Sequence, residues 1–196
     1  MILVAAGYAP VFDERPLAAP EMAAACRAVE RVLKGHEPFP ALAIDRHWAL
    51  VSANAAVAPL LAGADPALLK SPVNVLRLSL HPGGLAPRIA NLTEWRAHLL
   101  LRLRIQIEQT ADAVLIDLLA ELKKFPATNM LKPRMPPLRD ETAGVFVPFQ
   151  LVTDAGMLSF ISTTTVFGTP IDVTLSELAL ECFFPADDAT AQVLQR

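Results

Sequence analysis

The 196-residue sequence has few of the residues that build metal and redox sites. Its two cysteines, Cys26 and Cys182, belong to no CxxC pattern and no cysteine-histidine cluster, which argues against a structural zinc site. Both lie in apolar stretches, so we expect two buried free thiols in a reduced, cytoplasmic protein.

Catalytic signatures are missing as well. The sequence contains no GxSxG elbow, no Walker loop and no GxGxxG, and its four histidines lack ligands at metal-binding spacing. Ser79 and His81 would share one face of a strand, but no acid completes a triad. We therefore expect no enzyme, no metal site and no cofactor, and a hydrolase built around His81 or His98 is the least favoured alternative.

Long hydrophobic runs and excess positive charge are also absent. No apolar run is long enough to span a membrane, so we expect no membrane partner. The formal net charge of -3 argues against direct contact with nucleic acid. Acidic residues dominate the C-terminal part, and we interpret them as an ordinary solvated face: Asp154, Asp172, Glu177, Glu181, Asp187 and Asp188.

Hydrophobic residues make up 53% of the chain, enough for one domain to bury a full core. Apolar periodicity predicts helices over residues 21–34, 55–61, 92–109 and 113–125, and a short helix at the C-terminus. Asn54 and Asn91 stand where helix caps are expected, and Asn91 precedes Glu94 by the spacing of a capping box. Strand-like segments cover residues 41–45, 48–53, 145–152, 157–167 and 177–184.

This order of two strands, helices and three strands indicates an α+β domain whose sheet faces amphipathic helices. Such an arrangement commonly encloses an apolar pocket. Six aromatic residues are expected to face inward, most of them as core: Trp95, Phe149, Phe160, Phe167, Phe183 and Phe184. Arg88 and Arg96 lie near the start of the long helix, where either can meet a ligand carboxylate or remain a surface cation. The candidate pocket residues are Leu76, Leu80, Arg88, Trp95, Arg96, Leu99, Leu103, Phe149, Phe160 and Phe167.

Several blocks that occur in order resemble one family from Gly7 almost to Arg196. They are AAGYAPVFDERPL, HEPFPALAIDRHWALVSAN, NVLRLSLHPGGLAPRIANLTEWRAHLLLRLR and VFGTPIDVTLSELALECFFPADDAT. Together they are similar to the ligand-binding domain of MmyB-like bacterial transcription regulators. Members of that family carry an Xre-type helix-turn-helix domain followed by a PAS-like ligand-binding domain.

The resemblance implies a PAS-like antiparallel sheet packed with helices around an apolar pocket. It divides the chain into residues 1–20, the end of a helix-turn-helix domain and a linker, and residues 21–196, the ligand-binding domain. It also implies a ligand sensor for a small apolar molecule such as a fatty acid, with DNA contacted only through a helix-turn-helix domain largely missing from this sequence. The resemblance identifies no ligand contacts, so the candidates above come from periodicity alone.

Two functions from different classes follow from these observations. The first is a ligand sensor that changes its self-association, as a homodimer, when a small apolar molecule binds. The alternative is a homodimerising interaction module with a filled core and no small-molecule ligand.

Overall fold

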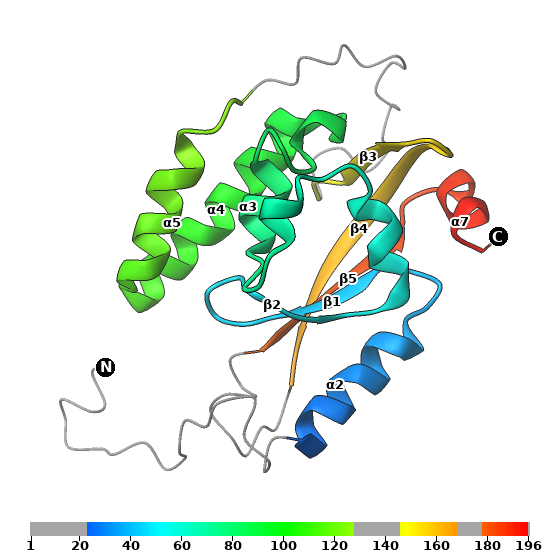
Figure 1. Cartoon of the computed structure of the whole chain (residues 1–196), viewed down its shortest axis with the longest axis horizontal. Helices are drawn as coiled ribbons and strands as arrows, with labels where there is room; N and C mark the ends of the chain where they lie inside the picture. Colours follow the sequence, from blue (N-terminus) through cyan, green and yellow to red (C-terminus); the bar gives the residue numbers. More distant parts are fainter. Residues whose placement is uncertain (1–22, 128–145, 168–177, 196) are drawn as a thin grey trace.

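An antiparallel sheet of five strands forms the centre of the computed structural model, which describes residues 23–127, 146–167 and 178–195 (Figure 1). The strands stand in the order β2-β1-β5-β4-β3. Their bounds are β1 Ala41–Ile44, β2 Leu50–Ala53, β3 Phe149–Thr153, β4 Gly156–Val166 and β5 Ala179–Pro185. The predicted order of two strands, helices and three strands is confirmed, and the curled antiparallel sheet with its helices is an α+β fold of the PAS-like kind.

Strand β5 joins the two halves of the chain. It pairs with β1 through Ala41 and Cys182 and with β4 through Ile161 and Phe184. Residues separated by more than a hundred positions therefore share one backbone ladder, and the sheet depends on contacts that no local sequence signal specifies.

Two tight turns set the strand pairing. The predicted hairpin turn from Thr153 to Gly156 is present, and Gly156 adopts a φ of 116°, which glycine tolerates without a steric penalty. In the β1–β2 turn, the Asp45 carboxylate accepts hydrogen bonds from the backbone N–H groups of His47 and Ala49, both at 2.8 Å. This turn holds Trp48 at a φ of 64°, in the left-handed region that bulky residues seldom occupy.

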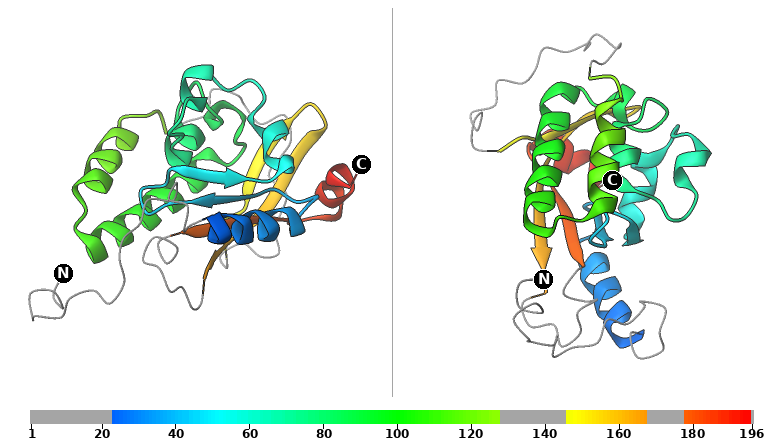
Figure 2. Two further views of the ribbon diagram at one scale, coloured as in Figure 1. Left: turned by 60° about the horizontal axis from the view of Figure 1, so that its bottom comes forward. Right: turned by 90° about the vertical axis from the view of Figure 1, so that its left-hand side faces the viewer.

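The sheet is covered on both faces, as the views in Figure 2 show. Helix α2, Ala23–Gly35, packs Val29 and Leu33 against the face that carries Leu180 and Cys182. Because side chains alternate along a strand, Glu181 and Phe183 point from β5 to the opposite face. That face meets α3, α4 and α5 over the larger of the two hydrophobic clusters.

The helical layer forms between β2 and β3. Its helices are α3 Val75–Leu80, α4 Leu92–Thr110 and α5 Ala113–Lys123, with 3-10 segments η2 Ala55–Leu61, η3 Pro66–Leu69 and η4 Ala86–Arg88. The predicted break near residue 110 is confirmed: Ala111 has a φ of 51°, and the Asp112 side chain caps α5 by accepting from Val114 N–H. Helix α7, Asp188–Leu194, follows β5 and packs against β4. No helix in the described part of the chain is long and apolar enough to cross a membrane.

Asn54 and Asn91 stand at the predicted N-cap positions, but neither side chain makes a capping hydrogen bond, because both have long-range partners instead. The Asn54 amide donates to the carbonyls of Leu33 and Phe39 and accepts from Ala41 N–H, so it joins α2 to the sheet. The Asn91 amide donates to the Pro148 carbonyl at 2.8 Å and joins α4 to the start of β3. Both side chains meet hydrogen-bonding needs that would otherwise remain unsatisfied away from water.

Three further expectations need correction. Ser79 lies in helix α3 and not on a strand, so its spacing from His81 does not place the two side chains on one face. Phe184 is 41% exposed, with its ring against His36, and does not face inward. Of the two thiols, Cys182 is buried and Cys26 is only half-buried.

Other predictions lie outside the described residues. They are residues 1–20, assigned to the end of a helix-turn-helix domain and a linker, and two residues of the predicted acidic face, Asp172 and Glu177. The division of the chain at residue 20 stays a prediction.

Candidate ligand cavity

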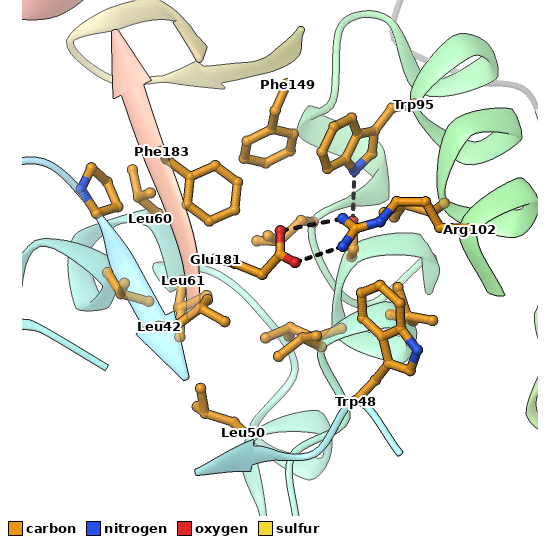
Figure 3. Close-up of a pocket in the computed structure, with 18 residues that line it drawn as sticks. Leu42, Trp48, Leu50, Leu60, Leu61, Trp95, Arg102, Phe149, Glu181 and Phe183 are labelled. Atoms are coloured by element: carbon orange, nitrogen blue, oxygen red, sulfur yellow. Dashed lines mark hydrogen bonds and ion pairs between the residues drawn. The ribbon is translucent and has the colours of Figure 1, made fainter. Parts of the chain in front are cut away.

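A cavity of about 100 Å³ lies between the inner face of the sheet and the helices α3 and α4 (Figure 3). Leu42, Phe149 and Phe183 wall it from the strands, while Leu76 and Leu99 wall it from the helices. Apolar cavities of about 150 Å³ accommodate a benzene-sized molecule. The observed space is smaller than that and matches a short alkyl chain, and a larger molecule requires the walls to move apart.

Both tryptophans of the chain line the cavity, and each has its indole nitrogen satisfied. Trp95 Nε1 donates to the Ser79 hydroxyl at 3.1 Å, and Trp48 Nε1 donates to the Gln106 side-chain oxygen at 2.7 Å. The Trp95 ring also packs on Phe149, with centroids 4.9 Å apart. These bonds fix the two rings, so their faces form rigid apolar walls.

One ion pair interrupts the apolar lining. Arg102 on α4 donates from Nη2 to Glu181 Oε1 at 2.6 Å and from Nη1 to Oε2 at 3.2 Å, which is a two-pronged contact between helix and sheet (Figure 3). The Thr164 hydroxyl donates to the same Glu181 oxygen at 2.8 Å. The Arg102 guanidinium also lies 4.9 Å from the centroid of the Trp48 ring, a cation–π distance.

The two partners of this ion pair differ in burial. The Glu181 side chain is 6% exposed and the Arg102 side chain 26% exposed. A buried carboxylate is stable only with a close cationic or hydrogen-bonding partner, so Glu181 depends on Arg102 more than Arg102 depends on Glu181.

A histidine flanks the cavity behind Trp95. The His98 ring stacks on the Trp95 ring with centroids 5.5 Å apart. Burial lowers the pKa of His98 below its ordinary value, and the nearby Arg102 charge lowers this pKa further. His98 is therefore favoured in its neutral form in the folded protein.

Of the residues proposed from the sequence, four line the cavity: Leu76, Trp95, Leu99 and Phe149. They come from α3, α4 and β3, which the fold brings to one place. Three others, Leu80, Leu103 and Phe160, are fully buried in the same hydrophobic cluster but stand behind the lining. The contact of all seven residues with a ligand stays a proposal.

The remaining three residues lie elsewhere. An Arg88 guanidinium nitrogen donates to the Leu60 carbonyl, and burial lowers the pKa of this arginine. Arg96 Nη2 donates to the carbonyls of Leu122 and Phe125 at 2.9 and 3.3 Å, which caps the end of α5. Phe167 packs against the second hydrophobic cluster, next to α2.

Sequence reasoning missed the ion pair. Glu181 was assigned to a solvated acidic face, which is wrong because the residue is only 5% exposed. A signal was present, since a single charged residue inside the apolar run LALECFFP is unlike a solvated strand. Arg102 follows Trp95 and Leu99 at the spacing of one helix face, which places all three side chains toward the same space.

Within the described ranges, no three histidine, cysteine, aspartate or glutamate side chains come together to hold a metal ion. What the cavity offers is apolar enclosure with a few fixed polar groups, the usual composition of a small-molecule site.

Comparison with known proteins agrees with this composition. The model of the MmyB-like transcription regulator ligand binding domain matches residues 25–196, and no curated protein matches the chain. The family is one of regulator domains that bind ligands and is not an enzyme family. Because the match covers most of the chain, this protein belongs to the MmyB-like transcription regulator ligand binding domain family.

Proposed function

We propose that this domain senses a small apolar molecule that binds in the cavity between the sheet and helices α3 and α4. The observation that carries the proposal is the lining, in which rigid aromatic and aliphatic walls surround a single paired set of charges. A fatty acid is the example implied by the family resemblance, and its acyl chain matches these walls. A molecule with the same apolar part and a neutral head group matches them equally.

A binding signal requires that the ligand favour one conformation over another. The cavity has a direct connection to the helices through the β1–β2 turn. Trp48 bonds to Gln106 on α4, and His47 Nε2 lies 2.9 Å from the Asp112 carboxylate at the α4–α5 junction. We propose that an occupant pressing on Trp48 shifts this turn together with the junction, and that a regulator transmits the shift to DNA through its helix-turn-helix domain in the cytoplasm.

Filling the cavity tests this function. Leu99→Trp places a larger ring in the space and should abolish 1-pentanol binding, followed by NMR chemical shifts, while the far-UV circular dichroism stays unchanged. Leu101→Trp is the matched control, because Leu101 lies two positions along the same helix and is 55% exposed. Equal 1-pentanol binding by both variants would remove this cavity as the ligand site.

A homodimerising module without a ligand is the second candidate, and a specific surface favours it. Two aliphatic side chains one turn apart on α4, Leu101 and Ile105, are 55% and 45% exposed. An apolar helical surface of this kind is typical of a subunit interface. We expect a dimer in analytical ultracentrifugation that Ile105→Glu converts to a monomer, and a monomer for the parent chain at every concentration would eliminate this candidate.

A further inference from the structure

We propose that the ligand of this cavity is electrically neutral, an apolar molecule with an uncharged oxygen-bearing group such as an alcohol, ketone or amide. The inference rests on the function proposed above and specifies its ligand class. It excludes a free carboxylate as the bound form.

The charges of the cavity already satisfy one another. Among the described residues that line it, Arg102 is the one cation and Glu181 the one anion. They are joined by two hydrogen bonds, and Thr164 adds a third on the carboxylate. A carboxylate ligand can take over the two-pronged contact with Arg102 only by displacing Glu181, whose side chain is 6% exposed and would be left buried without a cation.

The two other arginines expected near the site lie outside its lining and direct guanidinium nitrogens at backbone carbonyls, although Arg96 Nε is buried without a hydrogen-bond partner among the described residues. Arg88 donates to the Leu60 carbonyl. Arg96 directs Nη2 at three backbone carbonyls at the end of α5, those of Leu122, Lys123 and Phe125. Neither lines the cavity. Among the described residues, a ligand carboxylate would therefore share Arg102 with Glu181, and like charges at short range repel.

A neutral polar group does have a partner. The Ser79 hydroxyl lines the cavity and accepts the Trp95 indole hydrogen bond at 3.1 Å. A hydroxyl has one proton to donate besides its accepting lone pairs, so Ser79 can donate to an oxygen of the ligand. This neutral donor among apolar walls fits a carbonyl or hydroxyl oxygen, which accepts one hydrogen bond and carries no charge into a site of low polarity.

A series of ligands that share one alkyl chain tests the charge preference. The titrants are 1-pentanol, pentanoate and pentylammonium at pH 7.5 and constant ionic strength, followed by the emission of Trp48 and Trp95, the two tryptophans of the chain. We expect 1-pentanol to bind at least about tenfold more tightly than either ion, because burying an unpaired charge costs more than one factor of ten in affinity. Pentanoate binding as tightly as 1-pentanol would overturn the inference and leave the cavity proposal intact. Binding of none of the three would overturn the cavity proposal itself.

A variant separates the charge effect from hydrophobicity. Glu181→Gln keeps a hydrogen-bond acceptor for Arg102 but removes the competing charge, so pentanoate affinity should rise at least about tenfold and 1-pentanol affinity should change by less than about threefold. Glu121→Gln is the matched control, since it removes the carboxylate that pairs with Arg77 outside the cavity lining. Unchanged pentanoate affinity in a folded Glu181→Gln protein would contradict the assignment of charge exclusion to Glu181. If this variant does not fold, the three-ligand series with the wild-type protein tests the preference for a neutral ligand.

Discussion

The ion pair between Arg102 and Glu181 makes a prediction that the structure quantifies. Arg102→Met keeps the apolar stem of the side chain but leaves the Glu181 carboxylate, 6% exposed, with the Thr164 hydroxyl as its remaining partner. Removing one member of a buried pair costs about 3–5 kcal/mol, so we expect this loss in the free energy of unfolding. Glu181→Leu should cost less, about 1–3 kcal/mol, since Arg102 is 26% exposed and retains Thr164 and the Trp48 ring.

The double variant completes the cycle. Without either charge, neither position holds a buried charge that lacks its partner, and the stability should return to within about 1 kcal/mol of the parent protein. The coupling between the two sites would then be at least about 3 kcal/mol. The measurement is urea unfolding followed by far-UV circular dichroism, which does not depend on the tryptophans near the substitutions.

An exposed pair of the same chemistry serves as the control. Arg77 and Glu121 join α3 to α5 at 2.6 Å with side chains 37% and 39% exposed, and solvent should hold their coupling below about 1 kcal/mol. Glu181→Leu costing as much as Arg102→Met, or equal couplings in the two pairs, would refute the reasoning from burial.

Two further predictions concern the turn after α3 and the histidine behind Trp95. Gly84→Ala should destabilise the protein by more than about 3 kcal/mol in urea unfolding, because a Cβ there would lie 2.1 Å from the Leu78 carbonyl oxygen. Gly83→Ala should cost far less, because the atom nearest to its Cβ is His81 Nδ1, at 3.2 Å. Equal losses in the two variants would contradict the backbone contact at Gly84. Because burial lowers the pKa of His98 in the fold, the unfolded chain binds the proton more readily, so stability is complete above a pH of about 6.5 and falls as the pH drops through the folded-state pKa. His98→Gln should flatten the decline in urea midpoint between pH 7.5 and 5.5, and an unchanged slope would assign the decline to other groups.

Local signals predicted the elements of this fold well. The α4–α5 break appears in the sequence as Thr110-Ala111-Asp112, where an aspartate can cap the next helix, and the structure places it there. The strands around Leu42 and Phe160 follow from alternation and turn residues in the same way.

What the sequence could not supply depends on partners far along the chain. Asn54 and Asn91 have the residue type and position of helix caps, but carbonyls and N–H groups of distant segments use their amides instead. Glu181 and Arg102 are separated by 79 positions, and only the β5 and α4 placement shows that they meet. The left-handed backbone of Trp48 is likewise set by the turn around it and not by its own preference.

Mass spectrometry of small molecules extracted from the purified, denatured protein tests whether the cavity holds a neutral ligand. We expect a neutral apolar compound near one equivalent per chain, absent from Leu99→Trp protein but present in Leu101→Trp protein prepared in the same way. An extract that remains empty after the folded protein is incubated with 1-pentanol would contradict the existence of a ligand cavity, and a free carboxylic acid at one equivalent would contradict the neutral ligand.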